Sequence, residues 1–346
     1  MSIILALIIF SLLIIVHELG HFLLAKRGGI RVNEFSIGMG PRLVSRQVGD
    51  TLYCIKLLPF GGSCMMEGED GEETEGVPRE DSFQSKSVWT RISVVAAGPV
   101  FNFILSYLLA LFIIGGVGYD DTVIGVMEGY PAAEAGMQDG DEIISIGGSR
   151  TYLYREVSLY SSLHQGETTT VKYKRDGQVY TVTLVPQLSE SGSYLYGFQK
   201  SGVRTKGNVL EVVGYSAAEV RYWLKATVQS LAMLVRGQVG LNDMSGPVGI
   251  VSAIGETYEE SRSDGWYYVT LNMMMMAILL SVNLGVMNLL PIPALDGGRL
   301  LFFLIEVIRG KAVPPEKEGM VHFVGFVLLM GLMVVILFND VYKIIM

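Results

Sequence analysis

The chain has few of the residues that mark several common classes of protein. Only two of its 346 residues are cysteine, Cys54 and Cys64, which is too few for a disulfide framework, and we interpret both as packing residues. Its 26 Lys and Arg are outnumbered by 34 Asp and Glu, and the net charge of −8 offers no electrostatic footprint for nucleic acid. No Gly-x-Ser-x-Gly motif marks a serine hydrolase.

Hydrophobic residues, in contrast, are in excess. They make up 50% of the sequence, charged residues only 17%, and the mean hydropathy is +0.41. Four apolar runs, residues 3–25, 94–117, 268–290 and 321–338, are long enough to cross a hydrocarbon layer of about 30 Å as helices rising about 1.5 Å per residue. We therefore predict a mainly α-helical membrane protein with four transmembrane helices.

The first run contains the motif His17-Glu18-Leu19-Gly20-His21. Two histidines four residues apart on a helix project from one face and can hold Zn²⁺, with Glu18 beside them to take a proton from water. Ionisable side chains inside a span are costly and usually mark a functional site that faces the protein interior. The motif therefore predicts an intramembrane metalloprotease. A secretory signal peptide is disfavoured, because the basic residues follow this run and do not precede it.

The distribution of Lys and Arg predicts the orientation. These residues cluster after the first run, before the second, and between the third and fourth. Because cytoplasmic loops carry an excess of positive residues, these connections should be cytoplasmic. Both termini and residues 118–267 should then be external.

Between the first two runs, residues 34–58 have the pattern of extended chain. A hairpin turn at residues 48–51 is expected to join residues 42–44 to residues 52–55. Gly38-Met39-Gly40-Pro41 can form a flexible edge near the catalytic helix, although an ordinary surface turn explains the same spacing equally well.

The external region begins with alternating short strand and helix signals, and ends in a hairpin around Asp176-Gly177. Over about residues 122–187 this succession resembles a bacterial PDZ (α+β) domain. PDZ domains bind extended peptides by strand addition. Here the groove either captures a peptide or stays empty and acts as a steric gate.

After this domain, residues 216–236 have apolar positions at helical spacing and predict an amphipathic helix, which Gly246-Pro247 and its neighbours end. We divide the chain into residues 1–117 with the first two spans, 118–188 as the PDZ domain, 189–267 as the rest of the external region, and 268–346 with the last two spans.

A catalytic zinc usually has three protein ligands and one open position. The two histidines supply two of these ligands, so a third protein ligand is required. Asp296 is the best candidate. It begins a new segment after Pro291 and Pro293 break the third run, and irregular backbone at membrane depth is tolerated where it lines a watery cavity. Without the histidines, Asp296 would be read as a helix N-cap at a cytoplasmic turn.

With these motifs the chain resembles a bacterial site-2 protease of the regulator-of-sigma-E type, an intramembrane zinc metalloprotease. The resemblance covers almost the full length. Besides the first motif it includes residues 34–41, the turn at 58–62, Ala-Ala-Gly-Pro-Val-Phe-Asn-Phe at 96–103, and residues 283–285 and 288–298.

The resemblance implies His17, His21 and Asp296 as zinc ligands, and Glu18 as the general base. It also implies that Asn288 holds the substrate backbone, and that the segment around Gly38, Met39 and Gly40 enters the membrane as a β-hairpin beside the substrate. It places the protein in the bacterial cell membrane, with the active site towards the cytoplasmic side.

Gram-negative relatives carry two tandem PDZ domains, whereas the external length here accommodates only one. The family's usual substrates are membrane-spanning anti-sigma factors already cut outside, together with remnant signal peptides, so the implied partners are transmembrane peptides and the lipid bilayer. The competing function is an inactive, membrane-anchored PDZ scaffold that sequesters membrane peptides. The complete set of base and ligands favours the protease.

Overall fold

The computed structural model describes residues 1–69, 79–190, 192–202, 204–240 and 244–345. The chain divides into two compact units, one made of Met1–Leu109 with Thr227–Met346, the other of Ala110–Ala226.

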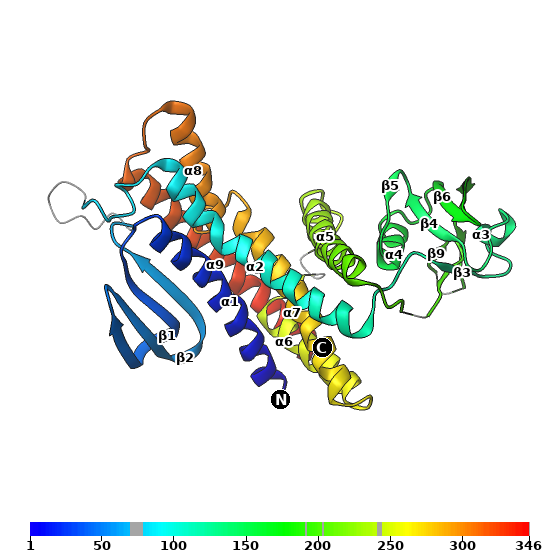
Figure 1. Ribbon diagram of the computed structural model, residues 1–346, viewed down its shortest axis with the longest axis horizontal. Coiled ribbons are helices and arrows are strands. Elements are labelled where there is room, and N and C mark those ends of the chain that lie inside the picture. The colour runs from blue at the N-terminus through cyan, green and yellow to red at the C-terminus, as the bar shows by residue number, and fades with distance from the viewer. Residues whose placement is uncertain (70–78, 191, 203, 241–243, 346) are drawn as a thin grey trace. The chain divides into compact units, whose positions relative to one another are not determined.

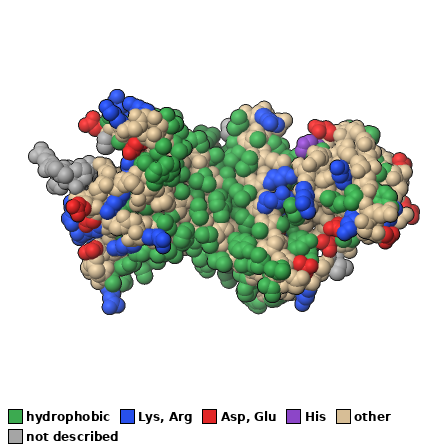
Figure 2. Space-filling view, turned by 45° about the horizontal axis from the view of Figure 1, so that its top comes forward, with side chains coloured by type: hydrophobic (Ala, Val, Ile, Leu, Met, Phe, Trp, Pro, Cys, Tyr) green, Lys and Arg blue, Asp and Glu red, His purple; other side chains and the backbone are tan. Residues whose placement is uncertain are grey.

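Within the described residues, four helices are long and apolar enough to cross a membrane, which confirms the prediction. They are α1 (Ser2–Arg27), α2 (Val88–Val117), α7 (Trp266–Leu289) and α9 (Pro315–Ile345). Helices that are apolar on all sides need burial in lipid or protein. Figure 1 shows α1, α2, α7 and α9 running along one another, and Figure 2 shows hydrophobic side chains covering much of the surface over these helices.

Strands β1 (Val32–Val48) and β2 (Thr51–Met66) form an antiparallel hairpin beside α1, as predicted, with its turn at Gly49 and Asp50. Both strands bend, so that residues 34–37 pair with residues 52–55 and also with residues 62–65. Apolar side chains of the hairpin are widely exposed, Leu43 to 59% and Val44 to 64%. Such a surface suits contact with the hydrocarbon layer better than contact with water.

Two clusters of buried side chains hold the first unit together. One joins α1, α6 (Pro247–Arg262) and α7 through residues such as Leu13, Ile254 and Ala277. The other joins the end of α1, the hairpin, α2 and α8 (Asp296–Arg309) through residues such as Val94 and Phe303. Cys54 and Cys64 are both buried and form no disulfide, as expected of packing residues. Helix α6 was not predicted.

The second unit contains the PDZ-like region, whose core is a four-stranded antiparallel sheet in the order β5-β4-β6-β7. Its elements are β3 (Ile124–Val126), α3 (Pro131–Glu134), β4 (Glu142–Ile146), β5 (Ser149–Arg150), α4 (Tyr154–Leu163), β6 (Thr169–Arg175), β7 (Gln178–Leu184), β8 (Gln187–Leu188), β9 (Tyr194–Leu195) and β10 (Phe198–Lys200). The hairpin of β6 and β7 confirms the predicted turn. Strand β10 pairs with β3, so the paired strands of this region extend past residue 188, the predicted end of the PDZ domain.

Helix α5 (Val209–Val235) follows and begins seven residues before the predicted amphipathic helix. Within the second unit it is tied to α4 by two ion pairs, Arg155–Glu219 and Arg221–Glu156. Burial raises the pKa of Glu219, and the Arg155 guanidinium opposes that rise. Paired buried carboxylates of this kind join two helices through a fixed geometry.

Candidate metal centre

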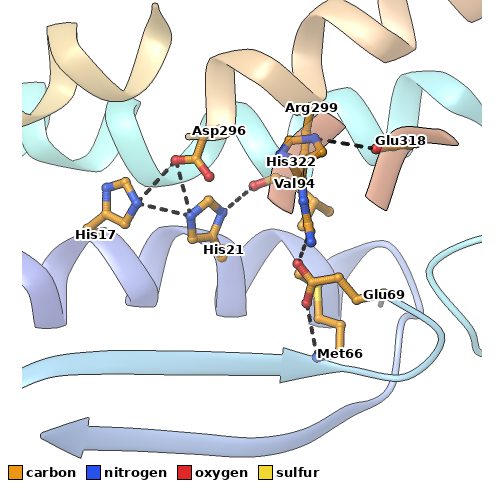
Figure 3. A network of polar contacts seen from close by, with 9 residues as sticks. All are labelled: His17, His21, Met66, Glu69, Val94, Asp296, Arg299, Glu318 and His322. Carbon is orange, nitrogen blue, oxygen red and sulfur yellow. Dashed lines mark hydrogen bonds and ion pairs between the residues drawn. The ribbon is translucent and has the colours of Figure 1, made fainter. Parts of the chain in front are cut away.

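The structure brings the three predicted metal ligands together. His17 and His21 lie one turn apart on α1, and Asp296 is the first residue of α8 (Figure 3). The Nε2 atoms of the two histidines are 3.2 Å apart. Asp296 Oδ2 lies 3.2 Å from His17 Nε2 and 3.6 Å from His21 Nε2. Both histidines are buried, and Asp296 is half-buried.

Hydrogen bonds to the other ring nitrogens set the tautomers of both histidines. His21 Nδ1 lies 2.9 Å from the carbonyl oxygen of Val94 and must donate to it. His17 Nδ1 lies 3.1 Å from the side-chain nitrogen Nδ2 of Asn102, while Oδ1 of the same amide has no hydrogen-bond partner among the described residues. With that amide turned so that Oδ1 accepts from Nδ1–H, the buried oxygen is satisfied. Both Nε2 atoms then carry lone pairs.

Three lone pairs therefore converge, two from Nε2 atoms and one from Asp296 Oδ2, which is itself buried with no hydrogen-bond donor among the described residues. Such an arrangement is repulsive unless a cation lies between the atoms. Zn²⁺ binds His nitrogens at about 2.0–2.1 Å, so tetrahedral ligands lie about 3.3 Å apart. The observed separations of 3.2–3.6 Å fit this ion.

Gly98 of α2 lies directly against the two imidazole rings. A Cβ placed there would come within 2.6 Å of His21 Cε1 and 2.7 Å of His17 Cε1, and would overlap His21 Nε2. Gly20 of α1 lies as closely against the backbone of Ala97. These glycines let α1 and α2 approach closely. In the sequence, Gly98 and Asn102 belong to the segment 96–103 that carries the family resemblance, but the resemblance implies no role for either residue. For Gly98, a small residue where two membrane helices cross was the available signal.

The three ligands open into a cavity of about 690 Å³ that Glu18 also lines. One wall is formed by the end of β2 and the residues that follow it, residues 62–69, and the opposite wall includes Arg299 of α8 and His322 of α9. A Cβ on Gly62 would lie 3.2 Å from Glu18 Cγ, so the strand passes close to the proposed base. Burial raises the pKa of the Cys64 thiol in this wall, and a buried, protonated thiol is a poor nucleophile.

The residues that the resemblance implies for substrate binding lie outside this cavity. Among the described residues, Gly38, Met39, Gly40 and Asn288 do not line the cavity. Gly38 and Gly40 have positive φ values at the bend of β1, next to Leu58. Met39 is 52% exposed, and Asn288 is half-buried near the end of α7. Their roles in substrate binding stay predictions.

We expect Asn102→Leu to weaken zinc binding about 10- to 100-fold, because outer partners of ligating histidines contribute on that scale. Leu keeps the volume of the buried side chain and removes only the acceptor for His17 Nδ1–H. Asn102→Asp keeps an acceptor and should retain more affinity. Competition with a chromophoric chelator measures the affinity. Equal affinity in Asn102→Leu and in the unaltered protein would mean that Asn102 does not orient His17.

Two histidines and an aspartate converging beside a glutamate, between membrane-spanning helices, define a membrane-embedded metalloprotease. Residues 5–332 match the profile of Peptidase family M50, and the chain belongs to this family.

The relatives agree with this assignment over nearly the whole chain. The zinc metalloprotease RasP of Geobacillus kaustophilus is 35% identical, over 99% of this chain and 98% of that protein. A putative zinc metalloprotease of Clostridium acetobutylicum is 36% identical, over 98% and 97%. The regulator of sigma-W protease RasP of Bacillus subtilis is 33% identical, over 97% of each. A PDZ-domain structure of the SdrC-like protein from Listeria monocytogenes covers 25% of this chain and 92% of that one, with 23% identity and a TM-score of 0.22.

The protein is therefore a multi-pass membrane zinc metalloprotease, and His17, His21 and Asp296 are its candidate zinc site. This confirms the predicted enzyme class, cofactor and resemblance to site-2 proteases.

Proposed function

We propose that this protease cuts peptide bonds inside the transmembrane segments of single-span substrates that have already been shortened outside the membrane. Anti-sigma factors and remnant signal peptides are the proposed substrate classes. The observation that carries the proposal is the convergence of His17, His21 and Asp296 on one cavity beside apolar helices. The relative in Bacillus subtilis is named as a regulator of sigma-W protease, which supports a role upstream of a sigma factor.

In the proposed reaction, Glu18 takes a proton from water and later delivers it to the leaving amine. When bound, zinc lowers the pKa of a water molecule to about 7 and polarises the scissile carbonyl. The acceptors at Val94 and Asn102 hold the two imidazoles so that both Nε2 atoms face the place where zinc would bind. Gly98 leaves the space that this arrangement needs.

A transmembrane substrate must unwind locally, because its carbonyls are engaged in helical hydrogen bonds. We propose that the freed strand pairs with residues 62–65 of β2. Those residues pair with residues 34–37 on one side, and among the described residues no strand pairs with their other side. They also line the cavity that holds Glu18. Strand addition would replace the hydrogen bonds lost on unwinding.

Gly38, Met39, Gly40 and Asn288 would then bind the substrate away from the cut bond, since they lie outside the cavity. The exposure of Met39 at the bend of β1 supports contact with a neighbouring segment. The Asn288 amide can donate and accept, and so can hold an unwound backbone.

We propose the topology that the basic residues indicate, with both termini and the PDZ-like region external. In that region a groove of about 300 Å³ lies between α4 and residues 193–198. The Tyr154 hydroxyl donates to the Phe198 carbonyl of β10 at 3.3 Å across this groove. Because a peptide strand added at β10 would have to compete with the Tyr154 hydroxyl for this carbonyl, we favour a steric gate over peptide capture.

Two reporter substrates that differ only near the centre of their span test this function. One carries Leu-Leu, the other the helix-breaking pair Asn-Pro. We expect the reconstituted full-length protein to cut the second at least about tenfold faster, because proline in a helix interior costs about 3 kcal/mol. Chelation should stop both reactions, and added zinc should restore them. Equal rates would refute the unwinding step, and cleavage that survives chelation would refute the metalloprotease proposal.

A further inference from the structure

The segment that carries Asp296 has an unusual backbone conformation. Ala294, two residues before the ligand, has a φ of +76°. Among the described residues, Asp176 in a hairpin turn is the only other non-glycine residue with positive φ. Residues with a Cβ persist in this conformation only where their surroundings hold them. The contacts that hold Ala294 in this conformation therefore also constrain Asp296, two residues further along the chain.

One side chain from another helix holds this backbone directly. The Ala294 N–H donates to Nδ1 of His322 on α9, at 2.9 Å. The His322 ring in turn packs at 5.7 Å from the ring of Phe302 on α8, and its Nε2 faces Glu318 at 3.9 Å (Figure 3). The acceptor role of Nδ1 places the ring proton on Nε2. The imidazole thus joins α9 to the ligand segment through one defined nitrogen.

A second contact of α9 fixes the same segment. Gly325, one turn after His322, lies so close to Pro293 that a Cβ there would be 2.8 Å from the Pro293 carbonyl oxygen. Pro293 has a restricted φ of its own. Two successive residues, Pro293 and Ala294, are therefore held by one turn of α9. Within the segment itself, Leu295 N–H donates to the Ile292 carbonyl at 3.2 Å.

We infer that His322 is a positioning residue for the third metal ligand. Metal sites need their ligands held within about 0.5 Å of the productive geometry. The hydrogen bond from Ala294 to His322 supplies that restraint from a helix that contributes no ligand itself. The inference rests on the proposed zinc site and adds that α9 completes it.

Two variants of similar size separate this role from a general packing role. In His322→Asn the side-chain oxygen takes the place of Nδ1 and can still accept from Ala294 N–H. In His322→Gln an acceptor takes the place of Nε2, and the bond to Ala294 is lost. For the full-length protein in detergent, we expect His322→Gln to lower zinc affinity about tenfold and His322→Asn to keep it within about threefold. Amide exchange at Ala294 in the metal-free protein should accelerate in the Gln variant only.

A third variant tests whether the positive φ of Ala294 is the reason that the hydrogen bond to His322 is needed. Glycine adopts positive φ without a holding contact, so Ala294→Gly should restore most of the zinc affinity that His322→Gln loses. Asp296→Ala serves as the reference. If Asp296→Ala loses zinc while the Asn and Gln variants bind it alike, whether tightly or weakly, the positioning role is wrong and the zinc site stands. If Asp296→Ala also keeps its zinc, the ligand assignment itself is wrong and the inference falls with it.

Discussion

Glu18→Gln should abolish proteolysis while leaving the metal in place. The amide cannot accept the proton of the attacking water, and general-base catalysis contributes about 10²- to 10⁴-fold. We therefore expect cleavage of a single-span reporter to fall by at least that factor. Zinc content should not change, because the carboxylate is not among the three converging ligand atoms. Initial rates in liposomes and metal analysis of the purified protein measure the two quantities.

Glu18→Asp is the matched control for this result. Its side chain keeps the carboxylate but is shorter by one methylene, so the base is present at a greater distance from the water. This variant should therefore show intermediate activity with full zinc content. Activity of Glu18→Gln within tenfold of the unaltered protein would place the base on another residue. Loss of zinc from Glu18→Gln would instead mean that Glu18 supports the metal site and not only the proton transfer.

Gly98→Ala is expected to destroy the metal site with a single methyl group. In most helix interiors this substitution stabilises the protein by about 0.5–1 kcal/mol. Here the added Cβ would overlap His21 and approach His17 Cε1 to 2.7 Å. The imidazoles or the two helices must move apart, and a displacement of about 1 Å costs about 10²-fold in activity. We expect zinc affinity and reporter cleavage both to fall by at least about that factor.

Gly115→Ala in the same helix provides the comparison. Among the residues that the structure describes, a Cβ there meets only Val212 Cγ1, at the ordinary contact distance of 3.9 Å. This variant should keep its zinc and its activity, and its melting temperature should stay unchanged or rise slightly. If Gly98→Ala also bound zinc normally, the close packing of α1 and α2 over the histidines would not be a requirement of the site.

Local patterns predicted the elements whose signals are local. The four spans follow from run length and apolar composition, which need no knowledge of the partners. The β1–β2 turn at Gly49 and Asp50 and the β6–β7 turn at Asp176 followed from turn residues alone. His17 and His21 could be assigned because a spacing of four on a helix fixes a shared face.

Two helices were missed or shortened because their start signals were misinterpreted. Gly246-Pro247 predicted an interruption, yet proline also favours the first turn of a helix, and α6 begins at Pro247. Helix α5 begins before the first strongly periodic residue. Asn208 accepts from the Glu211 N–H, and Glu211 accepts from the Asn208 N–H. This capping pair was present in the sequence and would have placed the start correctly.

By itself the sequence determined that the chain crosses a membrane and that α1 offers two histidines and a base, because hydrophobic run length and helical spacing are properties of neighbouring residues. Only the tertiary structure decided what surrounds these groups. Asp296, Asn102, Gly98 and His322 come from three other helices, and their distances from the histidines depend on how those helices pack. The distance between two segments that are far apart in the chain produces no periodic pattern in the sequence. A metal site, however, requires the distances between its ligands to be correct to within a fraction of an ångström.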